Sequence, residues 1–345
     1  MGQPQQAGRD TGFDRYPRGS RGQNAYSGCR CPHRKLHAPR DGKLRPFLRD
    51  PSRDKPTLGI SACLLGEPVR FDAGHKHDRW ITGTLSQYFD LVSVCPEVAI
   101  GLGIPRPPIQ LKGAANNIRV VGSRDPDLDV TDDLRRYGTK MAIQMDTIGG
   151  YIFKSKSPSC GLERVRLFPE GDGAPSRDGM GQYAAAFTMA QPLLPVEEEG
   201  RLNDPVLRDN FIERVFCFYR WQKLENRGIT AARLIDFHSC HKLLVLSHGV
   251  VPYRALGRLV ADTGKHKIRK MADEYIQRLM QALKRKATRR SHANVLQHLQ
   301  GYLKRALDRS DRQELVEVID HYRLGRVPLV VPMTLLRHHF RRHPD

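Results

Sequence analysis

Three cysteines lie where thiol chemistry could be assembled: Cys63, Cys95 and Cys160. Each follows a short run of β-branched or apolar residues, and each is followed within three residues by glycine or proline. In an open α/β sheet the ligand-binding crevice lies beyond the carboxyl ends of the strands. Three thiols that are distant in the sequence would therefore meet at one edge of such a sheet.

The residues alone leave three roles open for these thiols. They could bind zinc with a fourth ligand such as His75 or His77. They could bind three irons of a [4Fe–4S] cluster and leave the fourth iron open. They could also be inert buried thiols, as most intracellular cysteines are. The chain has no C-x-x-C pair, which argues against an ordinary structural zinc site.

The sequence around the cysteines predicts strands that alternate with a helix. Three strands are expected within TLGISACLLG (57–66), YFDLVSVCPEVAIGLGIPRPP (88–108) and GGYIFKSKSPSCG (149–161). One helix is expected between the second and third strands, within DLDVTDDLRRYGTKMAIQM (127–145). Asp129 or Thr131 can cap the helix. This alternation is typical of an α/β fold with a Rossmann-like, mostly parallel sheet.

The remaining segments differ in composition. From Asn203 or Asp204 onward, apolar residues recur at helical spacing, which predicts five to seven packed helices. We therefore expect four parts, which are a disordered basic extension (1–55), an α/β domain (56–168), a linker rich in Gly, Pro and acidic residues (169–205) and an all-α domain (206–345).

The extension contains a further group of potential metal ligands, Cys29, Cys31 and His33. A second ligand pair is not evident nearby, so the sequence disfavours a zinc site there. A solvated tail is favoured over a nucleic-acid-binding arm for this extension.

The net charge of +20 is unevenly distributed along the chain. Residues 1–54 hold 12 Lys/Arg against 5 Asp/Glu, residues 55–205 hold 17 against 19, and residues 206–345 hold 28 against 13. The ligand of the near-neutral middle is therefore not selected by bulk positive charge. Any nucleic-acid contact is expected on the extension and on the helical part.

The sequence also predicts the compartment. No apolar run approaches the roughly 18 residues of a membrane-spanning helix, and the N-terminus has no apolar signal segment. The seven cysteines are odd in number and scattered, so a disulfide framework is not expected. We therefore expect a cytoplasmic protein with no membrane contact.

The cysteine motifs resemble a known family. SACLLGEPVRFDAGHK, CPEVAIGLGIPRPP and KSPSCGLERV, in this order, resemble DUF523, which includes the 2-thiouracil desulfurases, over roughly residues 56–168. DFHSCHKLLVLSH, HANVLQHLQGYLKRAL and YRLGRVPLVVPMTLLRHHF resemble the DUF1722 (YbgA-like) domain over roughly residues 206–342. Together the two resemblances span most of the chain.

The resemblance implies a [4Fe–4S] cluster bound by Cys63, Cys95 and Cys160, with one open iron that takes the sulfur of a thiocarbonyl substrate. It implies that water replaces this sulfur, so that C=S becomes C=O and sulfide is released without net redox change. The implied substrate is a thiolated nucleobase similar to 2-thiouracil, or a small thioamide. A fourth cysteine ligand would close the position that the substrate needs.

Side chains near the cysteines are candidates for the remaining chemistry. Glu97, two residues after Cys95, is the favoured acid or base, and Asp72 is the second candidate. Either could instead stabilise its own turn. Ser61, Ser157 and Ser159 could donate hydrogen bonds to the substrate or to cluster sulfurs, and Arg106 could contact a substrate carbonyl or close the domain interface. Turn formation explains the serines equally well.

Two other functions remain open at this point. The substrate could be thiolated RNA, or the chain could be a nucleic-acid-binding or regulatory protein with a structural or sensing cluster. The basic run KRKATRRSH (284–292) could contact nucleic acid or form a solvated face. His238, His241 and His248 could bind metal, but we favour core or interface roles for them.

Overall fold

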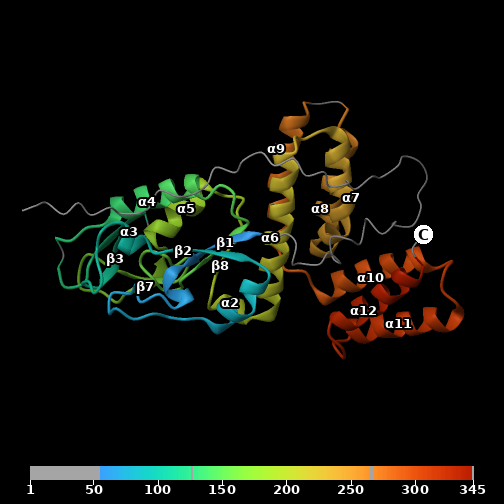
Figure 1. Ribbon diagram of the computed structural model, residues 1–345, viewed down its shortest axis with the longest axis horizontal. Coiled ribbons are helices and arrows are strands. Elements are labelled where there is room, and N and C mark those ends of the chain that lie inside the picture. The colour runs from blue at the N-terminus through green and yellow to red at the C-terminus, as the bar shows by residue number, and fades with distance from the viewer. Residues whose placement is uncertain (1–54, 115, 126, 265–266, 344–345) are drawn as a thin grey trace, which may run out of the picture. The chain divides into compact units, whose positions relative to one another are not determined.

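A computed structural model describes residues 55–114, 116–125, 127–264 and 267–343 (Figure 1). The expected basic extension, with Cys29, Cys31 and His33, lies outside the described residues. Among the helices that are described, none is long and apolar enough to cross a membrane.

A four-stranded parallel sheet with the order β2-β1-β5-β8 carries the cysteine-bearing loops. Its strands are β1 (Thr57–Ser61), β2 (Asp90–Val94), β5 (Gly150–Phe153) and β8 (Val196–Glu198). All three strand pairs are parallel. The strands that the sequence predicts before Cys63, Cys95 and Cys160 are β1, β2 and β5, so the predicted α/β class is confirmed.

A second four-stranded sheet with the order β4-β3-β6-β7 was not predicted. Its strands are β3 (Ile109–Ala114), β4 (Asn117–Gly122), β6 (Val165–Phe168) and β7 (Ser176–Gly179). The β3–β4 and β6–β7 pairs are antiparallel, whereas β3 and β6 are parallel. Leu111 and Val165 of this sheet share a core with Tyr151 of the first sheet. Short strands next to glycines and charged residues give too weak an alternation to be recognised in the sequence.

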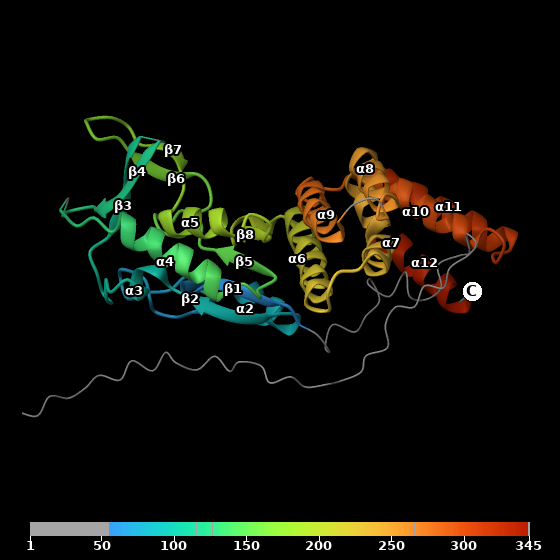
Figure 2. The same ribbon diagram turned by 90° about the horizontal axis from the view of Figure 1, so that it is seen from above.

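Helices and turns complete the α/β domain. They are η2 (Ala62–Leu65), α2 (Arg79–Gly83), η3 (Leu85–Gln87), α3 (Pro96–Ala99), α4 (Thr131–Gln144), α5 (Gln182–Ala190) and η4 (Arg201–Asn203). Helix α4 is the predicted helix, and it lies beside α5 in both views (Figures 1 and 2). The Asp129 carboxylate accepts a hydrogen bond from the Thr131 N–H at 2.9 Å, at the start of α4.

Residues 169–205, expected as a linker, are part of the α/β fold. Strand β7 pairs with β6 in the second sheet, and β8 pairs with β5 in the first. Tyr183 and Phe187 of α5 are fully buried. The many glycine, proline and acidic residues of this segment connect short elements, and for that reason its composition resembles that of a linker.

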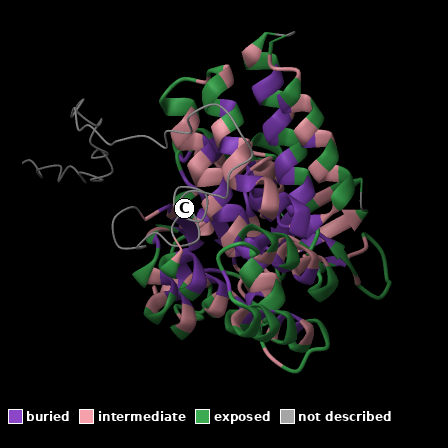
Figure 3. Ribbon diagram, turned by 90° about the vertical axis from the view of Figure 1, so that its right-hand side faces the viewer, coloured by how far each residue is buried: buried purple, intermediate pink, exposed green. Residues whose placement is uncertain are grey.

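From Pro205 to Arg342 the described chain is entirely helical apart from the connections, which confirms the predicted all-α part. The helices are α6 (Pro205–Asn226), α7 (Ala231–His248), α8 (Val250–Ala261), α9 (Ile268–Leu283), α10 (Arg289–Leu303), α11 (Arg309–Arg323) and α12 (Val330–Arg342). Their buried residues face one another and their exposed residues face outward (Figure 3). Helix α6 also packs Phe211 and Val215 against Leu58 and Ile60 of β1.

One glycine fixes the position of the Cys160 loop against α5. A Cβ on Gly181 would lie 2.5 Å from the carbonyl of Ser159 and 2.8 Å from the Cys160 nitrogen. Since backbone atoms cannot move aside cheaply, we expect Gly181→Ala to lower the free energy of unfolding by about 1–3 kcal/mol. Urea unfolding measures this change. The control is Gly171→Ala, whose Cβ meets nothing within 4 Å; equal stability of the two variants would contradict the prediction.

Candidate functional site

The structure places Cys63, Cys95 and Cys160 beyond the carboxyl ends of three neighbouring parallel strands. Cys63 lies in η2 directly after β1, Cys95 lies between β2 and α3, and Cys160 lies in the loop after β5. Strand β1 is hydrogen-bonded to both β2 and β5. Because all three strands run in the same direction, the three loops leave the same edge of the sheet.

The three thiols are largely buried, and they interact with one another electrostatically. None of them is in a disulfide. Burial raises the pKa of Cys63 to about 11 and raises the pKa values of Cys95 and Cys160 as well. Smaller electrostatic effects also raise the pKa of Cys63 through Cys95, and that of Cys160 through both other cysteines. The sulfurs are therefore close enough to interact electrostatically.

Three cysteine thiols form a donor set that an iron–sulfur cluster can take. Within the described residues, no group of three or more His, Cys, Asp or Glu side chains lies close enough to hold one metal ion. The ligands of a cluster bind different irons, so they stand further apart than ligands of one ion. His75 and His77, the alternative zinc ligands, are exposed, and the His77 ring is 2.9 Å from the Thr82 hydroxyl. Three soft sulfur donors are the ligands that iron–sulfur clusters take.

Glu97 forms a buried ion pair beside the cysteines. Its Oε2 accepts hydrogen bonds from Nη2 and Nε of Arg106 at 2.6 and 3.0 Å, and its Oε1 accepts one from the Ser159 hydroxyl at 2.9 Å. The Arg106 side chain is 2% exposed and that of Glu97 is 15% exposed. The ionised carboxylate raises the pKa of Cys160, although burial raises it more. Glu97 is thus an acidic group whose charge acts on both Cys95 and Cys160.

Arg106 is occupied by protein acceptors. Besides Glu97, it donates to the carbonyl oxygens of Val69 at 2.8 Å and Gly103 at 3.0 Å. The Cys95 sulfur lies 3.8 Å from the same Val69 carbonyl. Arg106 therefore connects the Cys63 and Cys95 loops and holds the Glu97 carboxylate, and its contact with a substrate stays a prediction.

Ser61 and Ser157 lie beside Cys160. The Ser61 hydroxyl accepts a hydrogen bond from the Lys154 N–H at 2.9 Å. It also interacts with Cys160 and lowers the pKa of that thiol against the larger effect of burial. Ser157 accepts hydrogen bonds from the backbone N–H groups of Ser159 and Cys160 at 3.2 and 3.1 Å. Ser157 therefore stabilises the loop, and Ser61 interacts directly with the candidate ligand Cys160.

Asp72 lies in an exposed turn. Its carboxylate accepts a hydrogen bond from the Gly74 N–H at 3.1 Å and pairs with Arg70 at 3.4 Å, and its side chain is 50% exposed. The Gly74 hydrogen bond is the main cause that lowers the pKa of Asp72. These contacts are those of a residue that stabilises its own turn, which is the alternative role that the sequence analysis gives for Asp72.

Sequence reasoning missed a second ion pair near Cys63. Lys154 forms an ion pair with Glu199, and Glu199 also accepts hydrogen bonds from the N–H of Ser155 at 2.7 Å and its hydroxyl at 2.8 Å. The Lys154 cation lowers the pKa of Cys63, although burial raises it more. Lys154 stands in the KSKSPSC motif, but Glu199 lies in the segment expected as a linker, so no local pattern indicates the pair.

The helical histidines have separate partners. Nδ1 of His238 lies 3.1 Å from the Tyr275 hydroxyl, Nδ1 of His241 lies 2.8 Å from the Phe237 carbonyl, and Nδ1 of His248 contacts the Arg285 carbonyl. Burial lowers the pKa of His238 to about 4 and that of His241 to about 3. Separate partners and burial are the properties expected of core histidines.

Comparison with known proteins agrees with both halves of this description. Residues 58–199 match the 2-thiouracil desulfurase family, and residues 242–345 match a family of unknown function, DUF1722. The uncharacterized protein YbgA of Escherichia coli (strain K12) is 37% identical over 140 residues, which cover 40% of this chain and 82% of YbgA. The chain belongs to the family of YbgA, and it carries a 2-thiouracil desulfurase domain followed by a DUF1722 domain.

A solved structure is also similar to the desulfurase-family domain. It is the [4Fe–4S]-dependent thiouracil desulfidase TudS, which is 31% identical in sequence, with a TM-score of 0.36. The match covers 45% of this chain and 97% of TudS. Neither the comparisons nor the contacts of the described residues support a nucleic-acid partner, so contact through 284–292 stays a prediction.

Proposed function

We propose that this protein is a non-redox desulfurase that replaces C=S by C=O in a thiolated nucleobase similar to 2-thiouracil, with release of sulfide. The observation that carries the proposal is the convergence of Cys63, Cys95 and Cys160 beyond β1, β2 and β5, within a match to the 2-thiouracil desulfurase family. These three cysteines would hold a [4Fe–4S] cluster. When bound, such a cluster supplies an open, thiophilic iron that polarises a thiocarbonyl group.

Glu97 is the residue we assign to proton transfer. Replacing sulfur by oxygen requires that a water molecule lose protons as it adds to the thiocarbonyl carbon, and a carboxylate can accept one. Arg106 and Ser159 each donate to a different oxygen of Glu97, which fixes the plane of the carboxylate. The 15% exposure of its side chain leaves a small part of Glu97 open to water.

Arg106 and Ser61 act as positioning residues in this proposal. Arg106 holds the Glu97 carboxylate and the Val69 carbonyl beside Cys95. Ser61 joins the Cys160 loop to the backbone after β5. The near balance of charge in residues 55–205 suits a small neutral base better than a polyanion.

The test is anaerobic purification followed by an assay with 2-thiouracil. We expect about four irons and four sulfides per chain, and stoichiometric formation of uracil and sulfide without added reductant. Liquid chromatography measures uracil, and a colorimetric assay measures sulfide. A fully loaded protein that releases no sulfide from 2-thiouracil would refute the assigned substrate, and a protein that binds no iron after reconstitution would refute the assigned chemistry.

A further inference from the structure

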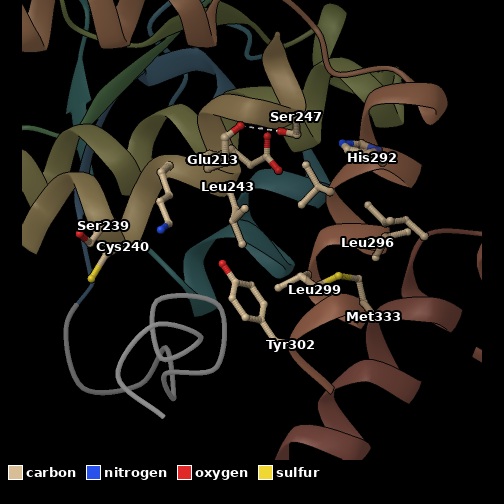
Figure 4. Close-up of a pocket in the computed structure, with 14 residues that line it drawn as sticks. Glu213, Ser239, Cys240, Leu243, Ser247, His292, Leu296, Leu299, Tyr302 and Met333 are labelled. Carbon is tan, nitrogen blue, oxygen red and sulfur yellow. Dashed lines mark hydrogen bonds between the residues drawn. The ribbon is translucent and has the colours of Figure 1, made fainter. Parts of the chain in front are cut away.

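A pocket in the helical part lies away from the three cysteines. It encloses about 160 Å³, and side chains from α6, α7, α10 and α12 contribute to its wall (Figure 4). Most of that wall is apolar, formed by Leu243, Leu296, Leu299, Tyr302 and Met333. An apolar protein cavity of about 150 Å³ accommodates one benzene molecule. The volume therefore fits a ligand with a single ring.

Polar groups lie on two sides of the pocket. Glu213, Ser247 and His292 lie on one side, and Ser239, Cys240 and Tyr302 lie toward the other (Figure 4). Nε2 of His248 lies 3.5 Å from one oxygen of the Glu213 carboxylate. The carboxylate side chain is 36% exposed. Glu213 thus retains the capacity to accept hydrogen bonds from a ligand.

His292 and Ser247 narrow the chemistry of that ligand. Nδ1 of His292 lies 2.7 Å from the Tyr322 hydroxyl, and burial lowers the pKa of His292, so its ring is neutral at pH 7. The Ser247 hydroxyl donates to the Leu244 carbonyl at 2.6 Å, which leaves its oxygen as an acceptor. The Glu213 carboxylate and the Ser247 oxygen therefore offer acceptors to a ligand N–H, and Lys242 also lines the pocket.

We propose that this pocket binds a small planar heterocycle of one ring that directs a ring N–H toward Glu213. The apolar side chains would cover the faces of the ring, and the carboxylate would accept its hydrogen bond. The inference goes beyond the proposed desulfurase activity because it uses none of the three cysteines. Helix α6 links the two parts, since it carries Glu213 at the pocket and packs Phe211 and Val215 against β1.

The test is calorimetric titration of the full chain with uracil and with 1,3-dimethyluracil, which has no ring N–H. The Cys63→Ala variant is titrated in parallel, so that binding at the cysteine site is recognised by its loss there. We expect uracil to bind both proteins and dimethyluracil to bind at least about tenfold more weakly, because one hydrogen bond to a charged group is lost.

Three variants assign the binding to the pocket. We expect Glu213→Gln to weaken uracil binding about 10- to 100-fold and Leu243→Trp, at a half-buried wall position, to abolish it. The control Glu314→Gln, exposed on α11, should bind as the wild type does.

Should Leu243→Trp fail to fold, Glu213→Gln decides the matter, with its melting temperature as a check on folding. No uracil binding, equal binding of dimethyluracil, or full binding by Glu213→Gln would overturn the proposal. The desulfurase assay is independent of all these outcomes.

Discussion

Replacement of Cys63, Cys95 or Cys160 by alanine will remove most of the bound iron and abolish sulfide release from 2-thiouracil. Each variant leaves two thiols, which are too few to hold a cluster that already has one iron without a protein ligand. Iron and sulfide analysis of anaerobically reconstituted protein measures the loss, and the visible absorption of the cluster should disappear with it.

The matched control for the cysteine series is Cys217→Ala. Cys217 is fully buried in the helical core, where it packs with Trp221 and Leu234, far in sequence from the three candidate ligands. We expect this variant to retain the full iron content, with a modest loss of stability from the small cavity. Retention of iron by any of the three site variants, or its loss in Cys217→Ala, would contradict the assigned ligands.

Replacement of Glu97 by glutamine will lower kcat for 2-thiouracil by about 10²–10⁴-fold while the iron content stays unchanged. The amide is similar in size and can still accept a hydrogen bond from Arg106 or Ser159, but it cannot take a proton from water. Steady-state kinetics measures the effect on protein loaded with iron. The control is Glu170→Gln, an exposed position next to β6, which should leave kcat unchanged.

A purely structural role of Glu97 would give a different pattern. Glu97→Ala leaves the Arg106 cation buried without its carboxylate, and loss of one partner of a buried ion pair costs about 3–5 kcal/mol. Glu97→Gln should be much less destabilised than Glu97→Ala in urea unfolding. If turnover falls only in proportion to the fraction of unfolded protein, Glu97 holds the loops together and takes no part in proton transfer.

The chemistry-bearing residues could be recognised in the sequence because each lies in a local pattern. A short apolar run, a cysteine and then a glycine or proline predicts a strand that ends in an open loop, and three such patterns predict three loops at one sheet edge. The helical part was recognisable for the same reason, because periodic apolar residues over α7, α9 and α10 report which faces are buried.

Longer-range features were not predictable. The second sheet depends on strands of four to six residues that are stabilised by pairing and not by their own composition. The same holds for 169–205, where β7 pairs with the preceding strand β6 and β8 pairs with β5, which is distant in the sequence. Helix α6 could be predicted as a helix, but its periodicity alone does not show that Phe211 and Val215 pack against β1.

The sequence by itself determined the two families, the α/β and all-α parts, and the three cysteines as candidate ligands. Only the tertiary structure decided the partners of the other candidates, since Glu97 and Arg106 come from the β2–β3 connection and Ser159 comes from the loop after β5. The structure shows the candidate substrate contact Arg106 as the buried partner of Glu97, and it places Asp72 in an exposed turn. Local patterns record which face of a segment is buried, whereas an ion pair between loops exists only once the sheet has set their order.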